Sequence, residues 1–123
     1  TLGICVGCQI ILESSEEDDG VNCLSLLPGK TVRFQEETGM KIPHMGWNQV
    51  NHDENHPLFE GIPSGTEFYF VHSFHPFDIP KENQLASSQY GSQTFCSVHG
   101  KANLVATQFH TEKSGEPGLK LLN

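Results

Sequence analysis

The chain has 123 residues, 36% of them hydrophobic, and a formal net charge of −8 at neutral pH. An acidic chain without a cluster of lysine or arginine argues against binding to nucleic acid or to anionic membranes. It has no apolar run near the roughly 20 residues that a membrane span needs, and no secretion-signal pattern. We therefore expect one domain, or part of one, in the cytoplasm, where its four cysteines stay reduced.

The order of the predicted elements is typical of an α/β chain. The elements are a strand over 1–4, a helix over 6–14, a strand over 31–34, a loop that becomes a strand over 41–50, a helical turn over 56–65, strands over 66–74, 84–91, 94–101 and 103–110, and a turn followed by a final helix over 111–123. The segment 66–74 is the strongest strand, because aromatic and β-branched residues predominate in it.

The segment LGICVGCQ places Cys5 where the first strand gives way to the first helix, with Gly3 and Gly7 two residues to either side. A strand that stops at a nucleophile and turns at once into a helix is a nucleophile elbow, whose strained turn requires small neighbours. The amides and dipole of the helix start would favour a thiolate and could stabilise an oxyanion. The alternative is a small cysteine buried in a tight turn, which is common.

A nucleophilic cysteine needs a base, and the base needs a group that orients it. His110 ends the strand over 103–110, so its side chain would emerge at the carboxyl edge of the sheet. The active crevice of an open α/β sheet lies at that edge. Glu112 follows two residues later and could hold the far side of the imidazole. Alone, His110 is an ordinary histidine, but with Cys5 and Glu112 it predicts a Cys-His-Glu triad.

Five segments resemble, in order and over nearly the whole chain, the glutaminase subunits of imidazole glycerol phosphate synthases, which are class I glutamine amidotransferases. They are GICVGCQIILESSEE, LLPGKTVRF, PHMGWNQV, FYFVHSF and QFHTEKSGEPGLKLL. The resemblance implies a flavodoxin-like α/β fold with a mostly parallel sheet and a nucleophile elbow. It implies that Cys5 attacks the side-chain amide of glutamine, His110 moves the protons and Glu112 orients His110. It implies no cofactor and no metal.

Further roles follow from the same resemblance, residue by residue. Val6 would donate its amide to the oxyanion, Gln9 would touch the backbone end of the substrate, and the pocket would be lined by His72, Ser73 and Phe74. Ammonia would pass to a cyclase subunit, a (β/α)8 barrel that makes imidazole glycerol phosphate in histidine biosynthesis. The face that meets this barrel in a heterodimer would comprise His44, Met45, Gly46, Trp47, Asn48, Tyr69 and Lys113. For Trp47, a half-buried core aromatic is the alternative.

Three departures from the family pattern stand out. The chain begins at the elbow strand, so we expect residues 1–123 to be the carboxyl-terminal portion of a single amidotransferase domain, without the family's amino-terminal strands. Thr111 replaces a proline between His110 and Glu112, which should loosen the triad without abolishing it. Cys8 stands where the family has an apolar residue, and a buried cysteine behaves as one.

Other functions stay open at this point. Cys5 and Cys8 at a helix start have the spacing of a thioredoxin-like dithiol, which leaves His110 unexplained. A zinc site would have Cys5, Cys8, His72 and His75 as its ligands. The H-x2-H spacing of the two histidines is tighter than is usual for zinc. A catalytically impaired subunit that keeps its partner contacts is a further alternative, as is a class I amidotransferase that serves another acceptor.

Overall fold

The computed structural model describes residues 2–4, 6–16, 21–24, 26–53, 56–101, 104–115, 118 and 121. Its strands and helices, in chain order, are β1 (Leu2–Ile4), α1 (Val6–Ile10), β2 (Ser14–Ser15), β3 (Val21–Asn22), β4 (Lys30–Arg33), β5 (His44–His52), the 3-10 helix η2 (Pro57–Phe59), β6 (Thr66–His72), β7 (Phe74–Phe77), the 3-10 helix η3 (Lys81–Asn83), β8 (Gln84–Tyr90), β9 (Gln93–Lys101), β10 (Leu104–Thr107) and the 3-10 helix η4 (Thr111–Lys113). Within this part of the chain, no helix is long and apolar enough to cross a membrane.

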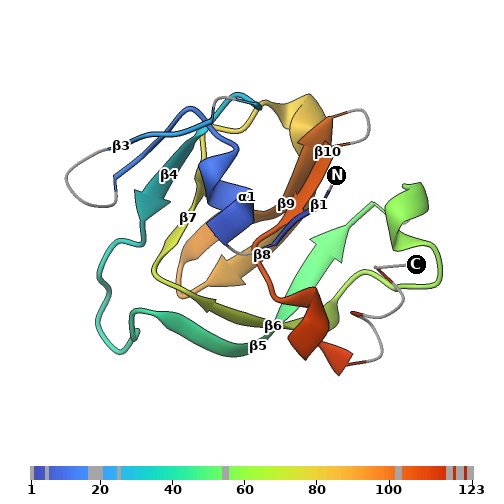
Figure 1. Cartoon of the computed structure of the whole chain (residues 1–123). Helices are drawn as coiled ribbons and strands as arrows, with labels where there is room; N and C mark the ends of the chain where they lie inside the picture. The colour runs from blue at the N-terminus through green and yellow to red at the C-terminus, as the bar shows by residue number, and fades with distance from the viewer. Residues whose placement is uncertain are drawn as a thin grey trace.

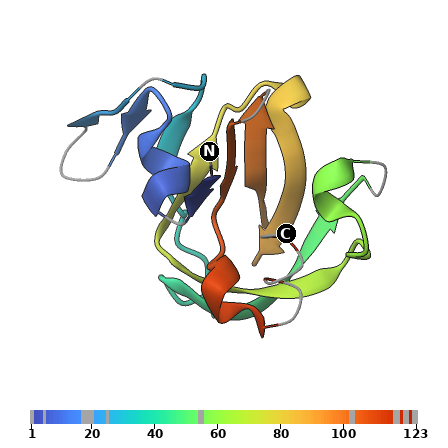
Figure 2. The ribbon, with the colours of Figure 1, turned by 45° about the vertical axis from the view of Figure 1, so that its right-hand side comes forward.

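The strands form two sheets. The larger has six strands in the order β1-β10-β9-β8-β5-β6, and the smaller has four in the order β3-β2-β4-β7. Figures 1 and 2 show the smaller sheet on the left, with α1 lying between it and β10. The long hairpin of β5 and β6 forms one end of the larger sheet and curves along the lower side of the view in Figure 1.

The prediction of a mostly parallel sheet is wrong for this part of the chain. Among the strand pairs described, β1–β10 and β2–β4 are parallel and the other pairs are antiparallel. The reason lies in the connections, because parallel neighbours need a long crossover whereas antiparallel neighbours can be joined by a tight turn. β8 and β9 are joined through Gly91 and Ser92 alone, whereas β5 leads into β6 through the longer segment 53–65, which holds η2.

Two clusters of buried hydrophobic residues fill the molecule. The larger gathers side chains from β5, β6, β8 and β9 and from the loops that cover them: Phe34, Val50, Phe59, Ile62, Phe68, Phe70, Ala86, Phe95, Val98, Phe109 and Leu121. The smaller lies where α1 meets β9 and β10: Cys8, Ile11, Leu12, Leu27, Ile79, Cys96 and Ala106. Burying a side chain of the Leu or Phe class stabilises a fold by about 1.5–3 kcal/mol, so the smaller cluster anchors α1 and β10, and the larger holds β5, β6, β8 and β9 together.

The helix after β1 is shorter than predicted. It ends at Ile10 instead of Ser14, because the backbone beyond it joins the smaller sheet. The amide of Glu13 donates to the carbonyl of Gly29, and that of Glu16 donates to the carbonyl of Thr31. The predicted strands over 1–4, 31–34, 66–74, 84–91, 94–101 and 103–110 all have counterparts. The predicted final helix lies largely outside the described residues.

Candidate active site

The ends of β1 and β10 define one edge of the larger sheet. The two strands run parallel, with Ile4 opposite Thr107. Cys5 follows Ile4 directly in the sequence, although it lies outside the described residues. His110 comes three residues after Thr107. Because the carboxyl ends of parallel strands share an edge, β1 and β10 both end on this side of the sheet.

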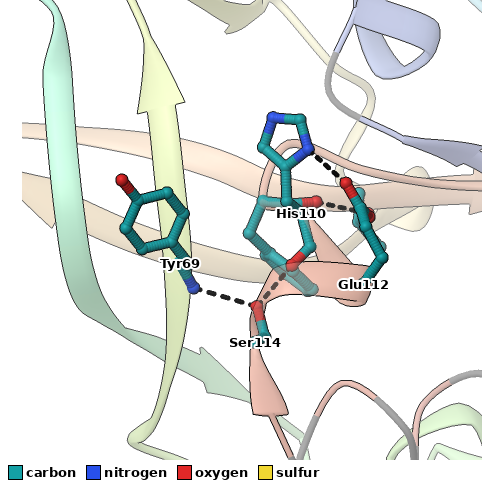
Figure 3. Close-up of polar contacts among 6 residues, drawn as sticks. Tyr69, His110, Glu112 and Ser114 are labelled. Atoms are coloured by element: carbon teal, nitrogen blue, oxygen red, sulfur yellow. Dashed lines mark hydrogen bonds and ion pairs between the residues drawn. The ribbon is translucent and has the colours of Figure 1, made fainter.

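His110 and Glu112 form a closed pair. Nδ1 of His110 lies 2.6 Å from Oε1 of Glu112, as Figure 3 shows. His110 precedes η4 in an extended conformation. The tight turn of η4 then brings the side chain of Glu112 back to the imidazole ring of His110. The imidazole is mostly buried and the carboxylate is half exposed. The ring therefore has one nitrogen fixed against a carboxylate and Nε2 left for another group.

The carboxylate of Glu112 is suited to orient this ring. Partial burial acts to raise the pKa of Glu112, but it is outweighed by a hydrogen bond from the residue's own backbone N–H, by the hydrogen bond from His110, and by the charges of His110 and Lys113. The net effect is a pKa below that of an ordinary glutamate. Glu112 is therefore ionised at neutral pH and accepts the proton on Nδ1 of His110.

Ser114 ties the backbone of His110 to β6. Its Oγ accepts from the amide of Tyr69 at 3.0 Å and donates to the carbonyl of His110 at 2.5 Å (Figure 3). The amide of His110 in turn donates to the carbonyl of Tyr69 at 2.9 Å. Ser114 is fully buried, so these bonds are sheltered from water. Ser114 was not predicted from the sequence, where the only signal for it is its place in the turn after the H-x-E pair.

The turn between His110 and Glu112 closes without proline. Thr111 is buried, and its Oγ1 has no hydrogen-bond partner among the described residues. A Cβ added to Gly118 would lie 2.0 Å from the carbonyl oxygen of Thr111, a distance that no side chain can accommodate without movement of the backbone. Close approach of the chain at Gly118 therefore supports the turn from behind.

Gln9 links α1 to the segment that leads to His110. Its Nε2 donates to the carbonyl of Phe74 and to Oε1 of Gln108, each at 2.9 Å. Gln9 and Gln108 are both buried. The predicted contact of Gln9 with substrate stays a prediction, because in this structure its amide group bonds to protein. Gln108 was not singled out from the sequence, since nothing in its local pattern separates it from a strand residue.

His72 and His44 lie against each other in the core. Nε2 of His72 is 2.9 Å from Nδ1 of His44, and Nδ1 of His72 is 2.7 Å from the carbonyl oxygen of Phe74. Burial lowers the pKa of His44 to about 4. Burial also lowers the pKa of His72 to about 3, against the opposing hydrogen bond to Phe74. The side chain of His44 is only 4% exposed, so it lies beneath the face that was predicted to meet a partner and not on it.

An apolar patch covers the outer side of the β5–β6 hairpin. Met45 is 62% exposed and Trp47 is 52% exposed. Across the hairpin they face Val71 and Tyr69, and the rings of Trp47 and Tyr69 meet edge to face with centroids 5.9 Å apart. Gly46, between the two exposed residues, has φ +130°, a conformation that favours glycine. Exposed apolar patches of this kind mark interaction surfaces.

Other predicted positions lie around this patch and this turn. Asn48 is half-buried on β5, and Lys113 is exposed on η4 beside the His110–Glu112 pair. Ser73 is half-buried, and its carbonyl accepts from the amide of Phe34. An open pocket of about 560 Å³ adjoins Met45. The lining residues of this pocket are Glu37, Thr38, Gly39, Met40, Lys41, Pro43, Met45, Tyr90 and Gly91.

Two alternative sites named from the sequence share residues with this region. Within the described part of the chain, no three His, Cys, Asp or Glu side chains come together in a way that could hold a metal ion. His72 and His75 instead direct Nδ1 at the carbonyls of Phe74 and Pro76. The thiol of Cys8 is fully buried, which disfavours an exchangeable dithiol with Cys5.

Comparison with known proteins decides the family. The model of the class-I glutamine amidotransferase family matches residues 1–122. The chain belongs to the class-I glutamine amidotransferase family. Two solved structures share the fold. A GMP synthase protein of Thermoplasma acidophilum gives a TM-score of 0.68 at 25% identity, with 98% of this chain and 52% of that one covered. A glutamine amidotransferase of Thermotoga maritima gives a TM-score of 0.62 at 20% identity, with 98% and 44% covered.

Within this amidotransferase family, curated relatives are much closer in sequence. An imidazole glycerol phosphate synthase subunit HisH of Dehalococcoides mccartyi is 49% identical over 120 residues, with 98% of this chain and 57% of the relative covered. The HisH subunit of Methanosarcina barkeri is 49% identical over 122 residues, with 98% and 59% covered. The chain thus spans a little over half the length of the curated relatives that it matches. The resemblance noted from the sequence is confirmed at the level of family and relatives.

Proposed function

We propose that the protein containing this chain is the glutaminase subunit of an imidazole glycerol phosphate synthase. The observation that carries the proposal is the His110–Glu112 pair, closed at 2.6 Å, at the end of the strand that pairs in parallel with β1. β1 leads directly to Cys5 in the sequence, which supports a nucleophile at the same edge of the sheet as the His110–Glu112 pair. The 49% identity to HisH subunits favours the ammonia acceptor of an imidazole glycerol phosphate synthase. The GMP synthase protein, whose acceptor is the alternative, is only 25% identical to this chain.

The geometry of the pair assigns the proton steps. Because Nδ1 of His110 donates to Glu112, the neutral ring keeps a lone pair on Nε2, which accepts the proton of the Cys5 thiol. The thiolate attacks the side-chain carbonyl of glutamine, and the carbon–nitrogen bond breaks as His110 gives that proton to the leaving nitrogen. Ammonia departs and a thioester remains. Water, deprotonated by His110, then attacks the thioester, releasing glutamate and returning the proton to Cys5.

The ligand contacts extend this proposal. By resemblance, the amide of Val6 at the start of α1 supports the oxyanion, and Gln9, His72, Ser73 and Phe74 border the glutamine site. Ammonia passes to a cyclase subunit seated on the face formed by Met45, Gly46, Trp47, Asn48, Tyr69 and Lys113. Exposure of Met45 and Trp47 beside the ring of Tyr69 supports this choice of face. Because His44 is buried beneath this face, we propose that its side chain supports the face without contacting the cyclase directly.

A glutamine analogue that alkylates active-site thiols tests the nucleophile in the full-length protein. Peptide mapping should find the label on Cys5 and not on Cys8, whose side chain is fully buried. Cys5→Ala should abolish glutamine hydrolysis, whereas Cys8→Met should leave it nearly intact. Labelling mainly at Cys8, or a large loss of activity in Cys8→Met, would refute the triad and favour a dithiol.

Coupling to the acceptor subunit is tested separately. Ammonia release should be slow for the glutaminase alone and faster when the cyclase partner and its substrate analogue are present, because the two sites are linked. Equal rates with and without the cyclase subunit would point to an amidotransferase that serves another acceptor. A protein that binds the cyclase but hydrolyses no glutamine would be the impaired subunit considered above.

A further inference from the structure

A chain of hydrogen bonds with one fixed direction runs through the buried histidines. The carbonyl of Phe74 can only accept, so Nδ1 of His72 donates to it, at 2.7 Å. Nε2 of a neutral His72 then carries a lone pair, and Nδ1 of His44, 2.9 Å away, must donate to it. Nε2 of His44 in turn accepts from Nδ2 of Asn48 at 3.3 Å. Asn48 also donates to the carbonyl of Gln89 at 2.8 Å, which fixes the orientation of its amide.

The burial of both rings keeps this polarity in place. His44 and His72 are opposite each other in the register of β5 and β6, and both side chains are buried. Their lowered pKa values keep both rings neutral near pH 7. A neutral ring has one donor and one acceptor, so each bond in the chain determines the next one.

The inner end of this chain of hydrogen bonds connects α1 to the segment that leads to His110. The carbonyl of Phe74 accepts a second hydrogen bond from Nε2 of Gln9, which also reaches Oε1 of Gln108. Gln9 follows Cys5 by four residues, and Gln108 precedes His110 by two. The outer end starts on β5, the strand that carries the exposed Met45 and Trp47.

We propose that His44 and His72 are positioning residues for glutamine hydrolysis. The chain of hydrogen bonds that runs from Asn48 through both rings, here called the relay, fixes the Phe74 carbonyl. This carbonyl in turn fixes the side chain of Gln9. This inference rests on the proposed function, in which Phe74 and Gln9 border the substrate. Neither histidine touches the reacting atoms. Losing the His44 donor leaves the lone pair of His72 unpaired in the core, which frees the ring of His72 to turn and release Phe74.

Two substitutions of His44 separate this role from simple packing. The ring of His44 stacks on Phe70 and on Tyr90, with centroids 4.9 and 4.1 Å away. His44→Phe keeps an aromatic ring in this stack but removes the donor to His72. His44→Asn discards the ring but places an amide N–H near the position of Nδ1. Positioning predicts damage in His44→Phe and recovery in His44→Asn, whereas packing predicts the reverse.

The measurement is steady-state glutamine hydrolysis by the full-length protein with its cyclase partner. In His44→Phe the KM for glutamine should rise about tenfold with a smaller change in kcat, because binding geometry is lost and chemistry is not. His44→Asn should restore KM to within about threefold of the wild-type value. The matched control is His52→Phe on the same strand, whose ring stacks on Phe59 at 4.0 Å and whose ring nitrogens have no described partner. It should leave KM unchanged.

A second readout keeps the inference testable if a variant fails to fold. Nitrogen-15 NMR of the wild-type protein should find the proton on Nδ1 in both His44 and His72. A proton on Nε2 of either ring would overturn the relay. An unchanged KM in His44→Phe, or a larger defect in His44→Asn than in His44→Phe, would overturn the positioning role. Wild-type protein that hydrolyses no glutamine would instead overturn the proposed function, while the NMR result would still decide on the relay.

Discussion

The amide of His110 donates a hydrogen bond to the carbonyl of Tyr69, at a distance of 2.9 Å. The amide of Tyr69 is held by Ser114, whose hydroxyl also bonds to the carbonyl of His110. Tyr69 therefore anchors the backbone of the proposed base, while its ring meets Trp47 on the exposed side of the hairpin. The proposed partner surface and the turn that holds the proposed base thus share one strand residue.

Replacing the orienting carboxylate should slow catalysis. Glu112→Gln removes the negative charge that lies 2.6 Å from Nδ1 of His110 and lets the new amide present a donor to the ring. We expect kcat for glutamine hydrolysis to fall at least about tenfold. The loss should be smaller than for a fully buried orienting carboxylate, because Glu112 is half exposed and water can partly replace its interaction with His110. The control is Glu60→Gln, at an exposed glutamate after η2. A change of less than about twofold in Glu112→Gln would contradict the role of Glu112.

Truncation of the exposed tryptophan should weaken association without unfolding the protein. Trp47→Ala should raise the Kd for the cyclase partner about 30-fold, equivalent to about 2 kcal/mol, if Trp47 is an anchor of the interface. The free energy of unfolding should change little, because the side chain is already half exposed. Phe77→Ala is a matched control, since Phe77 is 53% exposed and lies on the smaller sheet. Equal losses of affinity in the two variants would argue against this face.

Proline at position 111 should stabilise the turn. Thr111 is the first residue of η4, where a backbone N–H has no acceptor within the helix, and His110 before it is already extended at φ −88° and ψ 104°. Thr111→Pro should raise the free energy of unfolding by about 0.4–1 kcal/mol and keep glutaminase activity. Thr111→Ala provides the comparison, because it removes the unpaired hydroxyl without fixing φ. Chemical denaturation would detect the gain, and a net loss of stability would show that the turn needs threonine.

The buried histidines should make stability fall on mild acidification. His44 and His72 have folded-state pKa values of about 4 and about 3, below the roughly 6.5 of an unfolded histidine. Below pH ~6.5 the unfolded chain therefore binds more protons, and each residue lowers the free energy of unfolding by up to about 1.4 kcal/mol per pH unit until its folded pKa is reached. Above pH ~6.5 this dependence disappears.

Urea titrations at several values between about pH 7 and pH 5 measure this slope, a window that lies above the range in which the carboxylates titrate. His44→Phe should flatten the slope only in part relative to the wild type, because one buried ring no longer titrates while His72, His75 and His99, whose pKa values burial also lowers, still do. His52→Phe serves as the control for adding a phenyl ring to β5. A stability that stays level down to about pH 5 would mean that His44 and His72 are protonated readily in the folded state.

Local pattern predicted much of the fold and the contact between His110 and Glu112. The strands with alternating or aromatic sequence were identified, because their burial pattern is written into adjacent residues. β7 was missed as a strand, since Pro76 interrupts its short sequence. The H-x-E pair was predicted because both residues lie in one turn. The place of Cys5 beside this pair stays a prediction, which the labelling experiment tests.

Relationships between distant residues were harder to predict. His44 and His72 were assigned to different surfaces, although they bond to each other in the core. Their pairing depends on the register of the β5–β6 hairpin, and a shift of one residue would turn either side chain to the opposite face. The same is true of Gln9 and Gln108, which are 99 residues apart in the chain. Counting both strands back from the turn would have placed the two histidines opposite each other.

The parallel pairing of β1 with β10 has a consequence for folding kinetics. Leu2 pairs with Val105, whereas β8 and β9 pair across a two-residue turn. Contacts between residues far apart in the chain form more slowly than local ones, because the entropy of closing a long loop must be overcome first. The hairpins of residues 44–101 can therefore assemble early, and the edge that brings β1 beside the His110 turn is completed late. In refolding experiments, recovery of glutaminase activity should lag behind recovery of β-sheet signal.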